Sequence, residues 1–452
     1  MQEVNLAAML DAREARVAAQ EAMQAAHPDA VLVSFTLNIP GPIKNSPAIR
    51  RAFTFGCTAI EAILRDHSVV DHSRKDLFTG CEALWAVKAD ALPLKDACTA
   101  LEDDLPLGRL FDIDILAPDG SKIERRMVGK EERGCMVCGT PGRGCASRRL
   151  HTVAELQKAA WALIDGHFAP CDAEAIGHAA MSALLDEVET TPKPGLVDRN
   201  GSGSHTDMDI DTFRRSAHAL ESYFIQCAVL GMKHRSHAPE SLFPLLRAAG
   251  LEAEKAMYAA TNGINTHKGA IYTLGVLCGA VGSLWNVETP TPSTDALLDA
   301  CAVLTRTSVE ADLASIRAKG TAETAGERLY LEHGLTGIRG EAASGLPAVR
   351  NHGLPAFRKG LDGGLTAEEA GRYALLHLIA HTDDSTLWHR GGADGAAYAR
   401  KAAADLLKDG RFPTEEELLT LDRAFTARRL SPGGSADLLA VLYFLHRLEH
   451  LF

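Results

Sequence analysis

Two carboxylates lie two residues apart in the segment LPLGRLFDIDIL, whose apolar residues predict a β-strand. Side chains alternate along a strand, so Asp112 and Asp114 point to one face, where their repulsion favours a bound cation. Mg²⁺ commonly takes one or two protein carboxylates and leaves its other positions to substrate phosphates. Gly108 would let a phosphate approach the backbone, and Arg109 would neutralise it. The pattern indicates nucleotidyl transfer; the alternative is a strand edge that carries two solvated acids.

A second concentration of polar residues runs from Thr191 to Asp209, TPKPGLVDRNGSGSHTDMD. Its prolines and glycines interrupt helices, so we expect an ordered loop. The loop ends in an alternation of acids, Asp207, Asp209 and Asp211, which offers hard oxygen ligands for a divalent cation. The alternative is a polar surface loop whose last residues cap the helix predicted at DTFRRSAHAL.

Further polar loops interrupt the helices predicted after this segment. In GINTHKGAIYTLG, Asn265 or Thr266 would cap a helix, and Lys268 beside a helix N-terminus predicts an anion site. The segments GERLYLEHGLTGIRG, HTDDSTLWHRGG and RRLSPGGSADLL add Arg328, Arg339, Asp383, Asp384, Arg390 and the junction from Ser431 through Gly433 to Asp437. Each loop alone would be explained as a turn. Since rigid scaffolds present functional loops, we expect all five to converge on one site, with carboxylates for Mg²⁺ and cations for a polyphosphate.

The segment RGCMVCGTPGRGCASRRLH concentrates thiols and arginines. Cys135, Cys138, Cys145 and His151 would bind zinc tetrahedrally, although the spacing is short. The alternative is a loop of free thiols in which arginines contact substrate phosphates; these are Arg133, Arg143, Arg148 and Arg149. A substrate or structural loop is favoured over zinc.

Two kinds of secondary-structure pattern divide the chain. Residues 1–168 mix strands and helices, as in AVLVSFTLNIP, SPAIRRAFTFGCTAIEAILRD and the strand, turn and strand of LFDIDILAPDGSKIERRMV. This predicts an α/β or α+β domain of the nucleotidyltransferase-like kind. Residues 173–452 predict an all-helical domain, as in AIGHAAMSALLDEVE, TFRRSAHALESYFIQCAVLG, AEEAGRYALLHLIAH and ADLLAVLYFLHRLEHLF. We expect Pro170 to break the chain at the junction.

Length, charge and cysteine usage limit the class of protein. A chain of 452 residues is expected to form two or three domains. The net charge of −12 argues against a nucleic-acid partner. The apolar run GAIYTLGVLCGAVGSLW is short enough to predict a buried core helix, and no segment predicts a membrane span. The N-terminus lacks the apolar region of a signal peptide, and ten cysteines without a secretory context predict free thiols and a cytoplasmic protein.

The first half resembles the apo-citrate lyase phosphoribosyl-dephospho-CoA transferase family. The resemblance rests on LDAREARVAAQ, NIPGPIKNSPAIRRAF, LPLGRLFDIDIL and the cysteine-rich segment. It implies transfer of the citrate lyase prosthetic group to a serine of the apo acyl carrier subunit, with release of pyrophosphate. It also implies that Asp112 and Asp114 bind the metal and, less directly, that Lys44 or Arg50 contacts the phosphate chain.

The second half resembles the triphosphoribosyl-dephospho-CoA synthase family. Four motifs carry this resemblance in order, EVETTPKPGLVDRNGSGSHTDMD, GINTHKGAIYTLG, TDDSTLWHRGG and LSPGGSADLLA. It implies that ATP is split at its N-glycosidic bond, that adenine leaves, and that the triphosphoribosyl group moves to the 2′-hydroxyl of dephospho-CoA.

That chemistry explains the residue types of the second half. Breaking the ribosyl bond builds positive charge that carboxylates stabilise, and proton transfer needs an acid and a base. The candidates for these roles are Glu187, His205, Asp207, Asp209, Asp383 and Asp384, and the four aspartates are also the candidate Mg²⁺ ligands. The candidates that would hold ATP are Lys193, Asn265, His267, Lys268, Arg328, Arg339, Arg390, Ser431 and Gly433.

The two resemblances together imply a bifunctional maturation enzyme of citrate lyase, in which the second domain makes the intermediate that the first consumes. Its substrates would be ATP and dephospho-CoA, and its protein partner the apo acyl carrier subunit. The alternatives are the same chemistry for malonate decarboxylase, an ADP-ribosyl-hydrolase-like metal enzyme, and a zinc-dependent interaction module built on the cysteine-rich segment.

Overall fold

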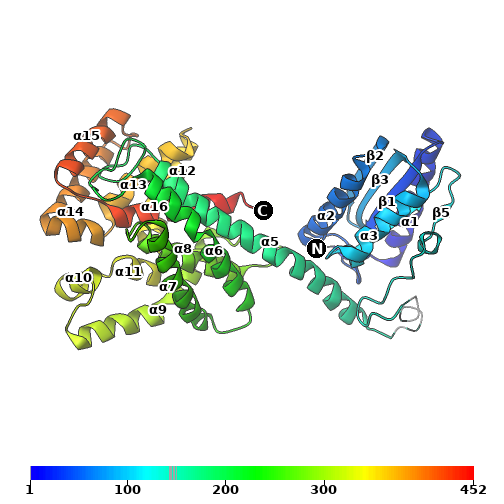
Figure 1. Cartoon of the computed structure of the whole chain (residues 1–452), viewed down its shortest axis with the longest axis horizontal. Coiled ribbons are helices and arrows are strands. Elements are labelled where there is room, and N and C mark those ends of the chain that lie inside the picture. The colour runs from blue at the N-terminus through cyan, green and yellow to red at the C-terminus, as the bar shows by residue number, and fades with distance from the viewer. Residues whose placement is uncertain (1, 142–144, 146–147, 149) are drawn as a thin grey trace. The chain divides into compact units, whose positions relative to one another are not determined.

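The computed structural model describes residues 2–141, 145, 148 and 150–452. The chain divides into an N-terminal unit, Met1–Ala169 with Val287–Thr289, and a C-terminal unit, Pro170–Asn286 with Pro290–Phe452. The N-terminal unit is a small antiparallel sheet with helices, and the C-terminal unit is helical (Figure 1). The predicted fold class is confirmed. Within the described part of the chain, no helix is long and apolar enough to cross a membrane.

The N-terminal sheet has five antiparallel strands in the order β2-β3-β1-β4-β5. The strands are β1 (Val31–Leu37), β2 (Ser68–Leu77), β3 (Gly80–Lys88), β4 (Phe111–Leu116) and β5 (Lys122–Ile123). The central strand β1 is apolar and almost wholly buried, which is why its sequence predicts it clearly. The predicted β1, β4 and β5 are confirmed. The edge strand β2 is polar and exposed along nearly its whole length. It lacks the alternation of apolar residues that would have predicted the β2–β3 hairpin from the sequence.

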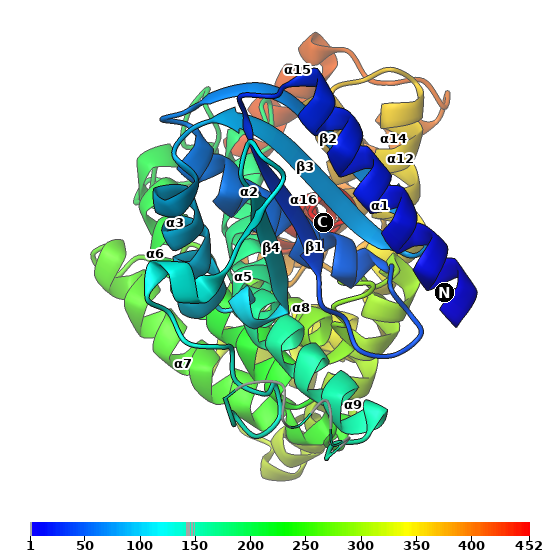
Figure 2. The same cartoon turned by 90° about the vertical axis from the view of Figure 1, so that its right-hand side faces the viewer.

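The two faces of the sheet are packed differently. Phe35 of β1 stacks on Phe53 of α2 (Pro47–Leu64) with ring centroids 5.0 Å apart. A side chain at Gly56 would bring a Cβ within 2.3 Å of the Phe35 ring, so the close packing of α2 on the sheet requires glycine there. The helix α1 (Leu6–Ala26) crosses the other face (Figure 2), where Met23 packs on a cluster that includes Leu32.

The remaining elements of the N-terminal unit lead to and from β4. They are α3 (Ala91–Asp104) and the 3₁₀ turns η1 (Gly108–Leu110) and η2 (Arg125–Val128). Lys95 of α3 is buried, and its Nζ donates to the carbonyl oxygen of Ile113 at 2.9 Å. The helix therefore covers β4 on the face opposite its two aspartates, since Ile113 alternates with them.

The prediction that Pro170 breaks the chain is wrong. The helix α5 runs from Val153 to Glu189 with Pro170 in its interior (Figure 1). An internal proline costs about 3 kcal/mol, so packing on both sides must outweigh it. Before it, Arg51 lies 4.2 Å from the Phe168 ring; after it, buried Asp172 accepts from Trp285 Nε1 at 2.9 Å. The boundary between the two units therefore falls inside a helix.

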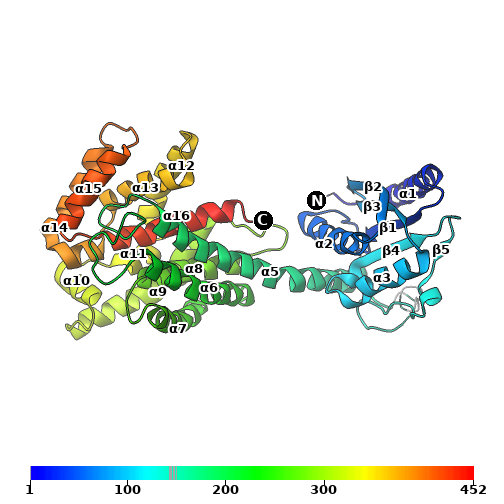
Figure 3. The same ribbon diagram turned by 45° about the horizontal axis from the view of Figure 1, so that its top comes forward.

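The helices of the C-terminal unit surround α8, which is buried along most of its length. It packs against α6, α7, α9 and α16 (Figure 3). The helices are α6 (Ile210–Lys233), α7 (Phe243–Ala260), α8 (Lys268–Leu284), α9 (Thr294–Lys319), α10 (Ala325–His333), α11 (Gly337–Ala343), α12 (Leu354–Asp362), α13 (Ala367–His381), α14 (Ser385–Leu407), α15 (Glu415–Ala427) and α16 (Gly433–Glu449), with short turns η3 (Pro239–Ser241) and η4 (Val349–Gly353). The helices predicted at α6, α8, α13 and α16, and the buried character of α8, are confirmed.

Candidate functional site

The polar loops of the C-terminal unit meet around a cavity of about 360 Å³. Its wall combines the end of α5 and the loop after it with residues at the starts of α8, α10, α14 and α16. The sequence-predicted residues that line it are Glu187, Lys193, His205, Asn265, His267, Lys268, Arg390, Ser431 and Gly433. Segments separated by up to about half of the chain thus share one site.

Four helices begin at this cavity. Its wall includes Lys268 of α8, Ala325 of α10, Ser385 of α14 and Gly433 of α16, each the first residue of its helix. The N-terminal turn of a helix carries unpaired N–H groups and the positive end of the helix dipole. Four such ends around one cavity favour an anionic ligand such as a polyphosphate.

A buried ion pair lies at the inner wall of the cavity. Lys193 is 1% exposed and Glu187 is 5% exposed. Lys193 Nζ donates to the Glu187 carboxylate at 2.5 Å and to the Glu187 carbonyl oxygen at 2.7 Å. Burial raises the pKa of Glu187, and the adjacent ammonium opposes that rise. The pair therefore places a carboxylate at the cavity whose charged form is favoured by Lys193 and disfavoured by burial.

A second carboxylate, Asp437 of α16, lines the same cavity. It accepts from the backbone N–H of Ala270 in the first turn of α8. A Cβ at Gly269 would lie 1.9 Å from its Oδ2, so glycine is required where the two helices meet. The side chain keeps partial contact with the cavity, but surrounding protein atoms shield it, and this shielding, with the charges of Glu187 and Asp384, raises the pKa of Asp437 well above its usual range.

Asp437 was predicted from the sequence only as the end of a loop-to-helix junction, with no catalytic or metal-binding role. It stands at the end of the quoted motif LSPGGSAD, so the available signal was an acid one turn inside a helix that starts with glycines. Such an acid ordinarily indicates a favourable helix N-terminus on the surface. Only the packing of α16 against α8 shows that it faces the cavity.

Asp384 lies behind the cavity wall and connects two of the helices that form it. It is 2% exposed and is the N-cap of α14, where it accepts from the backbone N–H groups of Thr386 and Leu387 at 2.9 and 3.2 Å. Its other oxygen accepts from the N–H and hydroxyl of Ser435 at 2.8 and 3.0 Å. One carboxylate thus joins the starts of α14 and α16, and burial raises its pKa while these four donors oppose the rise.

Two histidines line the cavity in their neutral form. Burial, then the charge of Arg390, lowers the pKa of His205 to about 4. Arg390 donates to His205 Nδ1 at 3.0 Å, and a guanidinium has no acceptor, so His205 carries its proton on Nε2 and donates to Ser431 Oγ at 2.9 Å.

His267 is the more deeply placed of the two, at 3% exposed. Burial, then the charge of Lys193, lowers its pKa to about 3. Its Nδ1 lies 2.7 Å from Ser216 Oγ, whereas its buried Nε2 has no hydrogen-bond partner among the described residues. A buried ring nitrogen without a hydrogen bond is uncommon in folded proteins, and this marks His267 as a candidate for a ligand contact. His267 is also the actual N-cap residue of α8, so the prediction that Asn265 or Thr266 caps this helix is wrong.

The alternating acids after the glycine-rich loop do not gather around one point. Asp209 is the N-cap of α6 and accepts from Thr212 N at 2.8 Å, as in the alternative considered for this segment. Asp211 pairs with Arg214 at 2.9 Å. Asp207 is exposed and lies 3.9 Å from His205 Nδ1. Helical and turn geometry turns these side chains apart, so alternation in the sequence did not become one face.

Three other predicted residues lie away from the cavity wall. Asp383 pairs with Arg400 at 2.9 Å on the surface. Arg328 is exposed on α10, which lines the cavity through Ala325, Gly326 and Leu329. Arg339 lines a neighbouring cavity of about 170 Å³, and Lys268 contributes to the walls of both cavities.

A larger cavity of about 480 Å³ lies elsewhere in the C-terminal unit, between α5, α13 and α16. Several of its polar groups already have partners, as in Arg447, whose Nη2 lies 2.8 Å from Asp186 Oδ1, and Glu189, which pairs with Arg214. None of the sequence-predicted site residues lines it. We therefore place the site in the smaller cavity, where unpaired groups and helix N-termini meet.

In the N-terminal unit, Asp112 and Asp114 share a face of β4 opposite Thr36 and Ser34 of β1. Asp112 is exposed, and Asp114 pairs with Lys122 at 2.6 Å. The predicted geometry of two carboxylates on one strand face is confirmed. Mg²⁺ takes one or two protein carboxylates when phosphates complete its coordination, and the two carboxylates on this face match that number.

The residues around this strand hold the local backbone together. A Cβ at Gly108 would lie 2.4 Å from the Leu101 carbonyl oxygen of α3, so the space beside Gly108 is filled by protein and is not open to a phosphate as predicted. Arg109 is half-buried and donates to the Gly134 carbonyl at 2.6 Å. Its role here is to hold the cysteine-rich segment.

The loop before α2 lies beside the start of β4, since Asn38 N donates to Leu110 O at 2.7 Å. Lys44 Nζ donates to the Ile39 carbonyl at 2.5 Å, and burial, then the charge of Arg13, lowers the pKa of Lys44. Arg50 donates to Asn45 Oδ1 at 3.0 Å. Lys44 and Arg50, the two residues predicted to contact phosphates, therefore make hydrogen bonds within this loop.

Two family models match the chain in succession. Residues 4–167 match the family described as apo-citrate lyase phosphoribosyl-dephospho-CoA transferase. Residues 173–452 match the family described as ATP:dephospho-CoA triphosphoribosyl transferase. The resemblances seen in the motifs are thereby confirmed for both halves.

Individual relatives extend along the whole chain. Protein CitXG of Haemophilus influenzae is 34% identical over 451 residues, which cover 98% of this chain and 96% of that protein. Protein CitXG of Leuconostoc mesenteroides is 32% identical over 459 residues, with 98% and 97% covered. A probable 2-(5''-triphosphoribosyl)-3'-dephosphocoenzyme-A synthase of Photobacterium profundum is 46% identical over 281 residues, which cover 61% of this chain and 88% of that protein.

Replacing Lys193 tests the buried pair. The variant Lys193→Met leaves the Glu187 carboxylate buried without its cation, and we expect a loss of about 3–5 kcal/mol in the free energy of unfolding. Adding Glu187→Gln should recover part of that loss. Urea denaturation followed by circular dichroism measures both. The control Lys401→Met breaks the exposed pair with Asp405 and should leave the midpoint nearly unchanged; equal losses in both variants would contradict the assignment.

Replacing Asp437 tests the raised pKa. Because the folded pKa exceeds the unfolded value, the wild-type protein loses stability as pH rises from the unfolded pKa of about 3.9 toward the folded pKa, by at most about 1.4 kcal/mol per pH unit. Asp437→Asn stays neutral and avoids that loss. Thermal unfolding should therefore show a melting-temperature advantage of the variant that is larger at pH 8 than at pH 5. A difference between variant and wild type that does not change with pH would contradict the assignment.

Proposed function

Because the chain belongs to the family of ATP:dephospho-CoA triphosphoribosyl transferases and, along its whole length, to the CitXG proteins, we propose that it is a bifunctional maturation enzyme of citrate lyase. The chain is a transferase. The match of residues 4–167 to the citrate lyase transferase family favours citrate lyase over malonate decarboxylase as the recipient of the product.

The C-terminal unit carries the first step. The C1′–N9 bond of ATP breaks, a bond forms from C1′ to the 2′-oxygen of dephospho-CoA, and the hydroxyl proton is balanced by protonation of the leaving adenine. The triphosphate remains on the ribose, so the protein must hold it without cleaving it. Helix N-termini, Lys268 and Arg390 around the cavity suit that grip.

The observation that supports this step most strongly is the opposite charge within one cavity. The positive ends of helix dipoles line the same cavity as the carboxylates of Glu187 and Asp437. A ribosyl transition state carries positive charge at C1′ beside the anionic triphosphate, so it needs both signs in one place.

The candidates for proton transfer are His267 and Asp437. His267 is neutral, and its unpartnered Nε2 can donate to or accept from a ring nitrogen or a hydroxyl. Asp437 has a raised pKa, so it is a candidate general acid for adenine or, once ionised, a base for the 2′-hydroxyl. Glu187, paired with Lys193, is the candidate for stabilising the charge at C1′.

The carboxylates of Glu187 and Asp437 fit a cation, since burial and then the charges of Glu187 and Asp384 raise the pKa of Asp437, and a bound cation would oppose that rise. Bound Mg²⁺ would neutralise triphosphate oxygens. Among the described residues, no three acidic, histidine or cysteine side chains of this cavity bring their ligand atoms within 4.8 Å of one another, so phosphate oxygens would have to complete the coordination.

The N-terminal unit carries the second step. A serine hydroxyl of the apo acyl carrier subunit attacks the α-phosphorus of the triphosphoribosyl group, the bond to the β-phosphate breaks, and pyrophosphate leaves. Asp112 and Asp114 would hold Mg²⁺, which supplies charge neutralisation at the phosphates. Their exposed face of β4 leaves room for a protein substrate.

Product analysis tests the first step directly. We expect the purified chain, incubated with ATP, Mg²⁺ and dephospho-CoA, to release adenine in equal amount to a triphosphoribosyl-dephospho-CoA product. Mass analysis of the nucleotides measures both. A reaction that forms ADP or AMP without adenine would mean that the N-glycosidic bond is not the one broken, and a reaction with water as acceptor would favour an ADP-ribosyl-hydrolase-like activity.

A paired substitution separates the two steps. Asp112→Asn with Asp114→Asn should lower transfer to the apo acyl carrier protein by at least ~100-fold, because the metal ligands are lost, while adenine release is kept. The matched control is Asp119→Asn, in the turn that follows β4. Full transfer activity in the double variant would remove these aspartates from the mechanism.

A further inference from the structure

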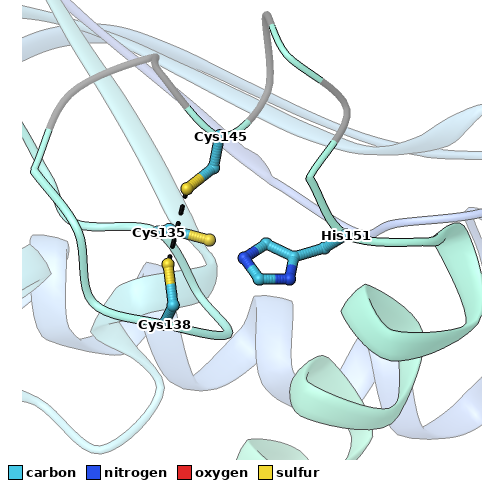
Figure 4. A group of neighbouring side chains, drawn as sticks. All are labelled: Cys135, Cys138, Cys145 and His151. Atoms are coloured by element: carbon cyan, nitrogen blue, oxygen red, sulfur yellow. Dashed lines mark hydrogen bonds between the residues drawn. The ribbon is translucent and has the colours of Figure 1, made fainter.

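Four potential metal ligands of the N-terminal unit converge on one point. One ligand atom from each of Cys135, Cys138, Cys145 and His151 lies within 4.8 Å of the others (Figure 4). The sulfurs of Cys138 and Cys145 are 3.4 Å apart. Tetrahedral zinc with Zn–S bonds of about 2.3 Å would place its sulfurs about 3.8 Å apart, so the cluster needs little adjustment to enclose the ion.

The backbone around the first two cysteines forms a tight turn. Gly139 N donates to the Cys135 carbonyl at 2.9 Å, and Cys135 N donates to the Thr140 carbonyl at 2.9 Å. Gly139 has a φ of +71°, a left-handed conformation that favours glycine. The turn brings the sulfurs of Cys135 and Cys138 to one side, which is what two ligands separated by two residues require.

The fourth ligand, His151, points into the cluster (Figure 4). His151 Nε2 is buried and has no hydrogen-bond partner among the described residues. Figure 4 shows a ring nitrogen of His151 directed at the three sulfurs. The next residue, Thr152, exchanges hydrogen bonds with Glu155 at the start of α5, which fixes the backbone beside His151. A buried nitrogen without a partner is costly unless something binds it.

We propose that Cys135, Cys138, Cys145 and His151 bind one structural Zn²⁺ ion. Three sulfurs and one nitrogen fill all four tetrahedral positions, so the site keeps no open position for a substrate. Binding releases the thiol protons, because the ligands must be thiolates. This reverses the preference for a loop of free thiols that the sequence spacing suggested. Arg143 and Arg149 of that loop lie outside the described residues.

The ion would hold the cysteine-rich segment against the strand that carries the two aspartates. Arg109 reaches back to the Gly134 carbonyl at 2.6 Å, and Arg133 donates to the Gly108 carbonyl at 2.5 Å and to the Phe111 carbonyl. These hydrogen bonds therefore hold the cysteine-rich segment at the start of β4, one residue from Asp112. If the proposed function holds, zinc loss lowers acyl carrier transfer and spares adenine release.

Metal analysis of the full-length protein tests the proposal. We expect about one zinc per chain by plasma mass spectrometry, after purification without added metal or chelator. Cys138→Ser should lose it, whereas the control Cys171→Ser, an exposed free thiol, should keep it. Adenine release by each variant reports that the chain is folded. Independently of any variant, Co²⁺-loaded wild type should show sulfur-to-metal charge-transfer absorption.

Three outcomes would overturn the proposal. Zinc absent with all ten thiols titratable in denaturant would mean free cysteines. Zinc absent with two thiols missing would mean a disulfide, to which the closely spaced Cys138 and Cys145 are suited. Zinc retained in Cys138→Ser would place the ion elsewhere, and the group of His446, Glu449 and His450 would then be examined by substitution.

Discussion

Negative charge held inside a helical bundle is the constraint on which the C-terminal unit depends. A shielded carboxylate is tolerated only where donors or a cation meet it. Glu187 has Lys193, whereas Asp384 and Asp437 have backbone N–H groups at the starts of helices. In a helix, the N–H groups without an intrahelical partner are those of the first turn, and the two aspartates lie at such turns. Asp384 joins the starts of α14 and α16, and Asp437 joins the start of α8, so these three helix starts and the shielded acids form one feature.

The same arrangement connects stability with ligand binding. Burial raises the pKa of Glu187 and of Asp437, as expected where a site is organised for charge rather than for packing. A ligand that brings both phosphates and a developing cation meets groups already oriented toward each. Little rearrangement is then needed at the moment of reaction, which is the advantage of a preorganised electrostatic site.

The N-terminal unit places its acids under a different constraint. Asp112 and Asp114 share one face of β4, where Asp112 is exposed and Asp114 is half-buried and paired with Lys122. The backbone around the strand is held by hydrogen bonds that Arg109 and Arg133 donate to carbonyl oxygens. The cysteine and histidine cluster lies at the far end of the same fastening, so the order of the cluster and the order of the strand's surroundings are coupled.

Sequence alone determined the elements whose pattern follows from burial, such as β1, α8 and α16, and it located the polar loops that interrupt the helices. It could not rank the acids within those loops, because an Asp that caps a helix and an Asp that faces a ligand have the same local sequence. Asp209 proved to be a cap, whereas Asp437 faces the cavity. Packing also decided that α5 continues through Pro170, since contacts on both sides outweigh the local cost. Tertiary structure sets which side of a helix turns inward, and with it which carboxylate loses its water.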